Sequence, residues 1–234
     1  RGDYPELSAL GVDVRRGDLQ DLEAVRAAVS GCEAVFHAAA KPPPWGRRSE
    51  YEAANVEGTR NVIEACVAAG CSYLVYTSTP SVVGGAEDIE GGDESLPYRK
   101  DFSGAEYPRS KALAERVLLA ADGQGGLRTL AIRPHLIWGP GDPHFLPRFV
   151  AKARAGQLRR IGRRDAEVDP TFISDAAAAH LCALQRLREG AEVSGRAYFV
   201  SGDERIGLWT MVDRMLGTAG LPALERSVPA ALAA

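Results

Sequence analysis

Residues 73–79 read Tyr-Leu-Val-Tyr-Thr-Ser-Thr, a short β-favouring, mostly apolar run followed by three hydroxyl residues. Such a run is typical of a strand that is buried on both faces of a parallel sheet. It lies between two segments, 51–69 and 107–121, whose apolar residues recur with the period of an amphipathic helix. Residues 34–37 and 130–132 are further short apolar runs. The order strand, helix, strand, helix predicts an α/β fold with a doubly wound parallel sheet.

The rest of the chain extends this pattern and adds a second region. Residues 21–29 also have helical periodicity, whereas beyond residue 139 the alternation becomes less regular. We therefore predict two domains, residues 1–140 and a smaller lobe of residues 141–234. In the less regular part, the sequence predicts helices near residues 145–155, 175–187 and 208–217, and strands around residues 168–173 and 196–200.

Composition excludes several classes of protein. The chain is 45% hydrophobic and 25% charged, and its formal net charge of −3 provides no broad basic face for nucleic acid. Charges interrupt its apolar stretches well before the ~20 residues that a membrane-spanning helix needs, so no span is expected. The four cysteines lack the spacing of metal or redox motifs. This predicts reduced structural thiols, no metal site and a cytoplasmic location.

Residues 107–111 read Tyr-Pro-Arg-Ser-Lys. A spacing of four puts Tyr107 and Lys111 on the same face of a helix. A free phenol has a pKa of about 10 and a free lysine one of about 10.4, so an adjacent ammonium favours the phenolate and lowers the tyrosine pKa. Such a pair can give a proton to a forming alkoxide or take one back. The same spacing also occurs on ordinary, partly exposed helix faces.

Other motifs favour a proton-transfer pair over an ordinary helix face. Together with Asp18 and Asn55, the Tyr/Lys pair and the stretches 75–81 and 133–142 resemble an extended short-chain dehydrogenase/reductase. The resemblance implies a Rossmann fold with a smaller substrate-binding lobe. It also implies hydride transfer between a nicotinamide and a carbonyl carbon, in which the cofactor supplies the chemistry and the protein supplies the geometry.

The resemblance carries roles over to matching residues of this chain. Tyr107 would be the acid or base, and Lys111 would lower its pKa and bind the nicotinamide ribose. Thr79 would polarise the carbonyl, with Ser78 as the competing candidate, and Asn55 would hold a relay water. Hydroxyl groups that follow a strand also satisfy backbone groups, which is the alternative for Thr79 and Ser78.

Cofactor-binding residues are expected at the carboxyl ends of the strands. Asp18, which ends a predicted strand, matches an aspartate that hydrogen-bonds the adenine amino group, although Asp18 and Asp21 are also suited to cap the following helix. Pro134 matches a proline beside the nicotinamide, and its missing N–H argues against a place in a central strand. Arg1 would meet a 2′-phosphate, which mildly favours NADP(H) over NAD(H), although a solvated terminal arginine is an equally good interpretation. The other residues expected at the cofactor are Leu19, His37, Ala38, Ala39, Lys41, Thr77, Ser78, Leu136, Tyr107 and Lys111.

The chain also departs from the family pattern. A strand and a glycine-rich turn normally hold the cofactor pyrophosphate, and the sequence contains no such turn. Its only methionines are Met211 and Met215, and it opens on Arg1 rather than on a strand. We therefore expect a fragment that lacks the first strand–helix unit and part of the substrate region.

A closer resemblance concerns the substrate. Residues 77–82 (Thr-Ser-Thr-Pro-Ser-Val) and 137–142 (Ile-Trp-Gly-Pro-Gly-Asp) are similar to the 3β-hydroxysteroid dehydrogenase branch, and within it to bacterial reductases of olefin biosynthesis. This similarity implies NADPH-dependent reduction of a 2-alkyl-3-oxoalkanoate to the 2-alkyl-3-hydroxyalkanoate. A homodimer is a further expectation, because relatives pair through helices that include the one with Tyr107.

The substrate candidates are aromatic, small or imidazole side chains near the predicted strand ends. Trp45 and Trp138 would line an apolar pocket, although tryptophans in such positions more often complete a core. His135 would meet a carboxylate, but a surface imidazole near a turn is the favoured interpretation. Pro80 and Ser81 complete the set.

Three other functions remain open at this point. The first is a 3β-hydroxysteroid or sterol 4-carboxylate dehydrogenase. The second is a nucleotide-sugar epimerase or reductase, which the apolar character of residues 42–45 and Trp138 disfavours. The third is a non-catalytic NADP-binding regulator. The combination of Thr79, Tyr107 and Lys111 argues against a regulator, since a silent binder does not need all three.

Overall fold

The structure is a computed structural model that describes residues 5–43, 46–84, 89–142 and 145–229. Its residues group into two compact units, one of residues 1–133 and 180–199, the other of residues 134–179 and 200–234. The helices are α1 (Pro5–Ala9), α2 (Leu22–Val29), α3 (Arg48–Tyr51), a π-helix η1 (Glu52–Glu57), α4 (Gly58–Ala69), a 3₁₀ turn η2 (Pro80–Val82), α5 (Glu106–Ala120), a 3₁₀ turn η3 (Gln124–Gly126), α6 (Leu146–Arg154), α7 (Ile173–Arg188) and α8 (Leu208–Thr218). The strands are β1 (Ala34–His37), β2 (Tyr73–Thr77), β3 (Arg128–Pro134), β4 (Ile137–Trp138), β5 (Arg160–Ile161), β6 (Glu167–Val168), β7 (Thr171–Phe172), β8 (Arg196–Val200), β9 (Ile206–Gly207) and β10 (Ser227–Val228).

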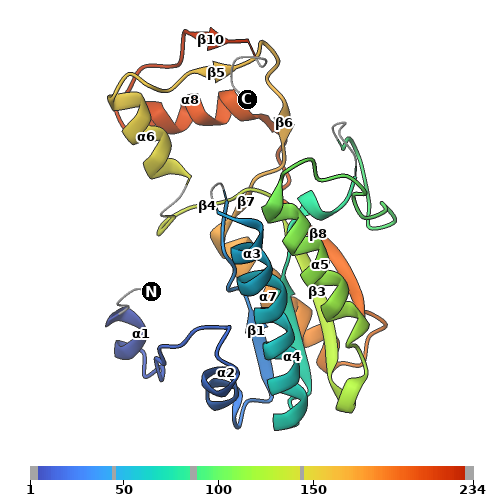
Figure 1. Cartoon of the computed structure of the whole chain (residues 1–234). Coiled ribbons are helices and arrows are strands. Elements are labelled where there is room, and N and C mark those ends of the chain that lie inside the picture. Colours follow the sequence, from blue (N-terminus) through green and yellow to red (C-terminus); the bar gives the residue numbers. More distant parts are fainter. Residues whose placement is uncertain (1–4, 44–45, 85–88, 143–144, 230–234) are drawn as a thin grey trace. The chain divides into compact units, whose positions relative to one another are not determined.

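A parallel sheet forms the centre of the first unit (Figure 1). Within the described residues its strand order is β1-β2-β3-β8. Strands β1 and β2 pair in parallel with Phe36 opposite Val75, and β2 and β3 pair in parallel with Val75 opposite Leu130. Val75 is completely buried, as a central strand covered on both faces requires. The doubly wound α/β fold predicted from residues 34–37, 73–76 and 130–132 is therefore confirmed.

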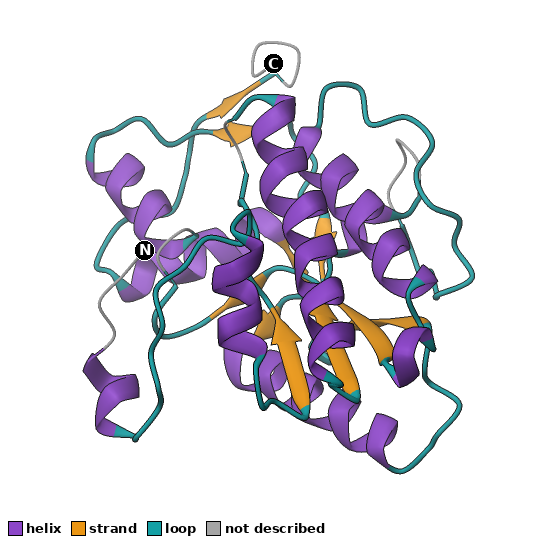
Figure 2. Ribbon diagram, turned by 60° about the horizontal axis from the view of Figure 1, so that its bottom comes forward, coloured by secondary structure: helices purple, strands orange, loops and turns teal. Residues whose placement is uncertain are grey.

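The alternation of side chains along β1 shows how both faces of the sheet are covered. The His37 ring points to one face, where its Nε2 lies 3.0 Å from the Thr59 hydroxyl of α4. The adjacent Phe36 ring points to the other face, where its centroid lies 5.9 Å from that of His180 in α7. Figure 2 shows the helices stacked over the strands in this layered arrangement. Successive residues of a strand face opposite sides, so one four-residue strand contacts helices on both faces.

The core of the first unit contains the buried cysteines. Cys66 and Cys71 are buried with Leu74 and Leu118, whereas Cys32 and Cys182 are exposed, and all four are free thiols. Burial, followed by the neighbouring Cys71, raises the pKa of the Cys66 thiol to about 12. A thiol with so high a pKa is unreactive at neutral pH.

The segment before α2 differs from the prediction. Residues 12–18 were expected to contain a strand ending at Asp18, but they have no regular structure. Val12 and Val14 are 48% and 41% exposed, so this segment buries little apolar surface, and within the described residues no strand pairs with it to satisfy its backbone groups. Asp21 caps α2 as expected, because its Oδ1 accepts hydrogen bonds from the amides of Glu23 and Ala24 at 3.1 and 3.2 Å.

The second unit has short strand pairs and a small core of its own. Helices α6 and α8 pack around the buried residues Leu158, Val212 and Leu216. Strand β4 pairs with β7, β6 with β9, and β5 with β10. Gly139 has a φ of +139°, and a Cβ there would lie 2.6 Å from Cγ2 of Ile173, so the turn after β4 depends on glycine.

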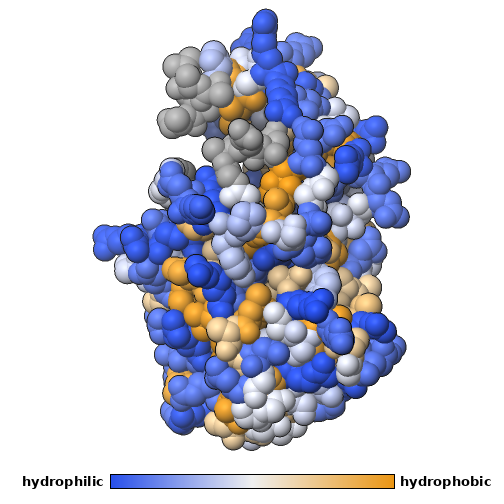
Figure 3. All heavy atoms as spheres, turned by 90° about the vertical axis from the view of Figure 1, so that its right-hand side faces the viewer, coloured by the Kyte–Doolittle hydropathy of each residue, from blue (hydrophilic) through white to orange (hydrophobic). Residues whose placement is uncertain are grey.

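One face of the molecule is mostly polar. Figure 3 shows a face on which hydrophilic side chains predominate and apolar ones lie between them in small groups. Among the described residues no helix is both long and apolar enough to cross a membrane. The described ranges also contain no group of three or more histidine, cysteine or acidic side chains arranged to hold a metal ion.

Candidate functional site

A π-helical turn positions Asn55. The segment predicted as one helix, residues 51–69, contains the π turn η1 between α3 and α4. Such turns add a residue to the helical repeat and often occur at functional sites. The buried Asn55 side chain accepts a hydrogen bond from the Lys41 amide at 2.6 Å and donates one to the Lys41 carbonyl at 3.3 Å. Asn55 therefore holds both backbone groups of a residue in the loop after β1. Its relay-water role stays a prediction.

Helix α5 brings the Tyr/Lys pair to the carboxyl end of β2. The ammonium of Lys111 is almost completely buried and donates a hydrogen bond of 2.6 Å to the Thr77 carbonyl. It also lies 4.0 Å from the centroid of the Tyr76 ring. Burial lowers the pKa of Lys111 to about 7, although the nearby Glu115 carboxylate acts in the opposite direction. Lys111 is a buried amine that titrates near neutral pH.

The expected lowering of the Tyr107 pKa is not what the structure shows. Burial, and then the proximity of Tyr51, raises the pKa of the half-buried Tyr107 phenol. Within the described residues, the Lys111 ammonium donates to the Thr77 carbonyl and not to the Tyr107 hydroxyl. Sequence spacing predicted the shared helix face, but it could not show that desolvation outweighs the charge of a lysine directed at the strand end.

Three hydroxyl residues at the end of β2 have different surroundings. The Thr77 hydroxyl lies 2.6 Å from Nε2 of His180. Thr79 Oγ1 caps the turn η2, because it accepts a hydrogen bond of 3.4 Å from the Ser81 amide, and it lies 3.1 Å from the Ser81 hydroxyl. The buried Ser78 Oγ has no hydrogen-bond partner in the part of the chain that the structure describes. Thr79 and Ser78 therefore both stay candidates for the carbonyl-polarising group.

A cavity of about 250 Å³ lies beside the end of β1. His37 at this end is a neutral imidazole, because burial and then the Lys111 charge lower its pKa to about 3. The Thr59 hydroxyl donates its hydrogen to the Asn55 carbonyl at 2.6 Å. Toward His37 the same oxygen must therefore be the acceptor, so the proton of the neutral imidazole is on Nε2. The predicted cofactor residues among those lining this cavity are Asp18, Leu19, His37, Ala38 and Ala39.

The Asp18 turn is held against the start of α4. The carboxylate of Asp18 accepts a hydrogen bond of 3.0 Å from the Gln20 amide. The carbonyl of Leu19 accepts one of 2.7 Å from the Asn61 side chain. A Cβ at Gly58 would lie 2.9 Å from Cβ of Leu19, so glycine permits this close approach. The turn is thus positioned by α4, and residues 12–17 before it have no regular structure.

Lys41 is held through both its backbone and its side chain. Its ammonium forms an ion pair of 3.0 Å with Glu50 and lies 5.4 Å from the centroid of the Tyr51 ring. The hydrogen bond from Lys41 lowers the pKa of Glu50. Its backbone, rather than its engaged ammonium, is the part of Lys41 that Asn55 fixes.

Four predicted residues belong to the second unit. Pro134 is the last residue of β3, which lies between β2 and β8, so the expectation that it avoids a central strand was wrong. Its position at the strand end explains this, because no further ladder donor is needed there. Leu136 has a φ of +42°, which is uncommon for leucine. The Trp138 ring packs edge-on against Phe172 with a centroid distance of 5.0 Å.

His135, the fourth, is half-buried rather than on the surface. Its Nδ1 accepts a hydrogen bond of 3.3 Å from the Asp169 amide, and its carbonyl accepts one of 2.8 Å from the Thr171 hydroxyl. Burial lowers its pKa, with Asp169 acting in the opposite direction. The surface imidazole expected from the sequence was therefore wrong. The predicted residues Arg1 and Trp45 lie outside the described residues.

Sequence reasoning missed a buried ionic group next to Lys111. Glu115 forms an ion pair of 2.5 Å with Arg133 of β3, and the Tyr98 hydroxyl donates to the same carboxylate at 2.7 Å. Glu115 is 0% exposed and Arg133 is 4% exposed. The available signal was its spacing, since Glu115 follows Lys111 by one helical turn on α5.

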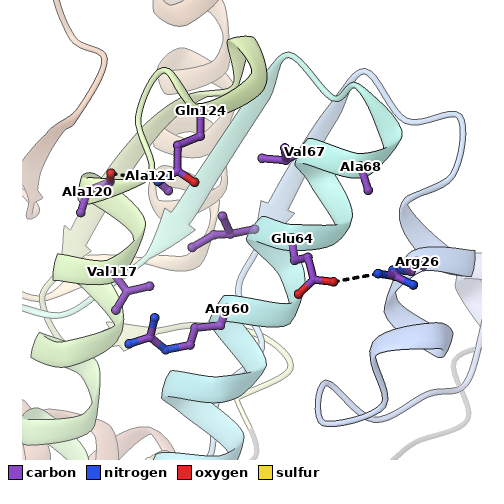
Figure 4. A pocket seen from close by; sticks show the side chains of 10 residues that line it. Arg26, Arg60, Glu64, Val67, Ala68, Val117, Ala120, Ala121 and Gln124 are labelled. Carbon is purple, nitrogen blue, oxygen red and sulfur yellow. Dashed lines mark hydrogen bonds and ion pairs between the residues drawn. The ribbon is translucent and has the colours of Figure 1, made fainter.

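A larger groove of about 670 Å³ lies over the outer sides of α4 and α5 and reaches α2 (Figure 4). Arg26 and Glu64 form an ion pair of 2.7 Å at one side of it, and Val67 and Val117 contribute apolar surface. None of the predicted catalytic or cofactor residues is among those lining this groove.

The first unit fits a nicotinamide dinucleotide at the carboxyl ends of β1 and β2. The side chains of Ala38 and Ala39 are small enough for close approach of a ligand to the backbone. The orphaned hydroxyl of Ser78 and the buried amine of Lys111 are polar groups suited to a ligand at that edge.

This sheet and site define the chain as an extended short-chain dehydrogenase/reductase-type α/β protein. It belongs to the 3-beta hydroxysteroid dehydrogenase/isomerase family, whose model matches residues 4–228. It is 45% identical to the 2-alkyl-3-oxoalkanoate reductase of Shewanella oneidensis, covering 100% of this chain and 62% of that protein. It is 46% identical to the reductase of the same name from Stenotrophomonas maltophilia, covering 97% of this chain and 69% of that protein.

More distant relatives include the human sterol-4-alpha-carboxylate 3-dehydrogenase, decarboxylating, at 35% identity over 91% of this chain and 57% of that protein. Among solved structures, gox2253 superimposes with a TM-score of 0.80 at 25% identity, covering 97% of this chain and 67% of that chain. MoeE5 in complex with UDP-glucose and NAD gives a TM-score of 0.75 at 26% identity, covering 97% and 80%. The chain thus spans less than two thirds of the Shewanella and human relatives.

Proposed function

We propose that the protein is an NAD(P)-dependent oxidoreductase that transfers hydride between a nicotinamide and a carbonyl or secondary alcohol. The observation that carries the proposal is the buried Lys111 amine at the carboxyl end of β2, one helical turn from Tyr107. A buried amine with a pKa near 7, one helical turn from a half-buried phenol with a raised pKa, is the type of perturbed titratable group that catalytic sites contain. The family and the two reductase relatives support the same reaction class.

In the direction of reduction, the nicotinamide when bound supplies the hydride to the carbonyl carbon. Tyr107 gives its phenolic proton to the carbonyl oxygen, so that a hydroxyl forms and a phenolate remains. Protonated Lys111 stabilises that phenolate and binds the nicotinamide ribose. The hydroxyl of Thr79, or that of Ser78, donates a hydrogen bond to the same carbonyl oxygen and stabilises its developing charge.

We propose that the cofactor lies along the carboxyl ends of β1, β2 and β3, with residues 1–140 as the cofactor domain and residues 141–234 as the substrate lobe. NADP(H) is the proposed form, with Arg1 at the 2′-phosphate, and NAD(H) is the alternative. The residues proposed to contact the cofactor are Arg1, Asp18, Leu19, His37, Ala38, Ala39, Lys41, Thr77, Ser78, Tyr107, Lys111, Pro134 and Leu136.

Calorimetric titration tests this part of the proposal. NADPH and NADH are titrated into the 234-residue chain and into a form that carries the family's glycine-rich turn at its N-terminus. We expect binding by the second form, with NADPH preferred. An absence of binding by both forms would refute the oxidoreductase proposal, and a preference for NADH would refute the role of Arg1.

The proposed substrate is a long-chain 2-alkyl-3-oxoalkanoate, which is reduced to the 2-alkyl-3-hydroxyalkanoate. The names of the two relatives at 45% and 46% identity support this choice. Trp45, Pro80, Ser81, His135 and Trp138 are proposed to line its site. Oxidation of 2-alkyl-3-hydroxy acids, 3β-hydroxysteroids with sterol 4-carboxylates, and UDP-sugars is measured in parallel. Turnover of the hydroxy acids alone supports the proposal, and turnover of a sterol or a UDP-sugar alone replaces it.

The sterol alternative has the support of the human sterol-4-alpha-carboxylate relative at 35% identity, and the nucleotide-sugar alternative that of MoeE5 at 26%. Cofactor binding without turnover of any substrate would instead favour a non-catalytic NADP-binding regulator.

We also propose a cytoplasmic location, which the four free thiols support. A homodimer formed through the groove on α4 and α5 completes the proposal.

A further inference from the structure

The loop after β1 and the helix α5 are connected through one buried side chain. The Asn55 amide contacts both backbone groups of Lys41, at 2.6 Å and 3.3 Å, which fixes the position of that residue. The second hydrogen of the same amide nitrogen points to α5, where Nδ2 donates to Ser110 Oγ at 2.9 Å. Asn55 is 2% exposed and Ser110 is completely buried, so water does not compete for these bonds.

Ser110 continues the connection to Tyr107, the proposed proton donor. Its hydroxyl donates a hydrogen bond of 2.8 Å to the carbonyl of Tyr107, three residues earlier on α5. The hydroxyl therefore acts as acceptor toward Asn55 and donor toward Tyr107, which uses its single hydrogen. The resulting series of bonds, which we call the Lys41–Tyr107 clamp, consists of Lys41, Asn55, Ser110 and Tyr107.

The first turn of α5 needs such support. Ala105 at the N-cap has no side-chain oxygen and makes no capping hydrogen bond, so the helix start is not fixed by its own cap. Pro108 follows Tyr107 and contributes no amide hydrogen. A second, partly buried connection to the same π turn exists, in which Arg109 forms an ion pair of 2.8 Å with Glu52. That pair does not include Lys41 or Asn55.

We propose that Ser110 is a positioning residue that sets the Tyr107 and Lys111 turn of α5 relative to the Lys41 loop at the cofactor, an inference that rests on the proposed function. Ser110 touches neither substrate nor cofactor in this role. Its hydroxyl orients the Asn55 amide, and the oriented amide holds the loop. Removal of the Ser110 hydroxyl leaves one N–H of the buried Asn55 side-chain amide without an acceptor. We therefore expect both ends of the clamp, the Lys41 loop and the Tyr107 turn, to become less rigid.

Hydrogen exchange tests the clamp without reference to activity. The Lys41 amide is the donor to Asn55 Oδ1, so exchange in a peptide that covers residues 38–43 reports the loop. We expect about tenfold faster exchange in Ser110→Ala and at least as large an increase in Asn55→Ala. The matched control is Glu52→Gln, which weakens the Arg109–Glu52 connection between the same two elements and should leave exchange at Lys41 unchanged. Equal exchange in Ser110→Ala and the parent chain overturns the proposal.

Kinetics of the double variant test whether the two residues act as one unit. With the proposed β-keto acid and NADPH, Ser110→Ala and Asn55→Ala are each expected to lower kcat/KM about tenfold. The double variant should be no worse than the worse single variant, since both changes break the same clamp. A loss of about a hundredfold would show independent effects and overturn the proposal. Faster Lys41 exchange together with an inactive parent chain would refute the proposed function and leave the clamp standing.

Discussion

At the residue scale, Lys111 is a titratable group whose environment departs far from that of a free side chain. It combines near-complete burial, a hydrogen bond of 2.6 Å to the Thr77 carbonyl, and the charge of Glu115 one turn away. Burial dominates and lowers its pKa from 10.5 to about 7. The amine therefore changes its charge within the pH range in which an enzyme works, and both stability and catalysis should depend on that change.

Stability should rise with pH through this titration. Below pH 7 the lysine is protonated in the folded and the unfolded chain, and the folded chain bears the full cost of a buried charge. Between pH 7 and about 10.5 the unfolded chain binds the additional proton, so the free energy of unfolding increases with pH. Lys111→Met should flatten this slope in urea denaturation. An identical slope in the variant and the parent chain would contradict the assignment of the pKa.

The hydroxyl groups after β2 allow a second prediction at this scale. We expect Thr79→Ala to lower kcat/KM about a hundredfold, the usual effect of removing one donor to a developing oxyanion. Thr79→Ser keeps the donor and should retain most of the activity, and Ser78→Ala should lower kcat/KM less than Thr79→Ala does. Steady-state kinetics of the three variants decide the matter. The reverse pattern would assign the role to Ser78, whose hydroxyl has no partner within the described residues.

At the scale of elements, periodicity predicted the sheet and its helices because each element buries one pattern of apolar residues. It failed where tertiary contacts decide the structure. The π turn at Asn55 has the composition of an ordinary helix. The strand predicted to end at Asp18 pairs with no other strand among the described residues. For the site, the sequence predicted which residues take part but not the hydrogen bonds that connect them. The bonds through Ser110 and Glu115 depend on elements far apart in the sequence, which spacing alone does not show.

The packing of α5 against β3 depends on Glu115. Glu115→Gln should lower the free energy of unfolding by about 3–5 kcal/mol, because it leaves the Arg133 guanidinium buried without a full charge partner. Chemical denaturation measures this. The control is Glu23→Gln, which removes an exposed pair with Arg26 and should leave stability unchanged. A similar loss in both variants would show that burial of the ion pair is not what matters.

At the scale of the whole molecule, the family model matches residues 4–228, and the chain covers 62% of the length of the Shewanella reductase. Its assembly is the property that the sequence predicts least directly. The groove on α4 and α5 presents Val67 and Val117 between charged side chains, which suits a contact with a second copy.

The proposed homodimer can be tested by changing this groove. Val117→Glu places a charge among its apolar side chains, and we expect the mass measured by light scattering to fall from that of a dimer to that of a monomer. Leu181→Glu, at a 63% exposed position on α7, is the control and should keep the dimer. A monomeric parent chain, or a dimeric Val117→Glu variant, would contradict this assignment.

The measurement that tests the central claim most directly is the effect of Tyr107→Phe on NADPH-dependent reduction of a 2-alkyl-3-oxoalkanoate. It is made in the form that carries the family's glycine-rich turn. Loss of the proton donor should lower kcat/KM by about 10²–10⁴-fold. Tyr73→Phe, at the amino end of β2, is the matched control and should leave it unchanged. If Tyr107→Phe stays within a factor of a few of the parent, Tyr107 is not the acid and the proposed mechanism is wrong.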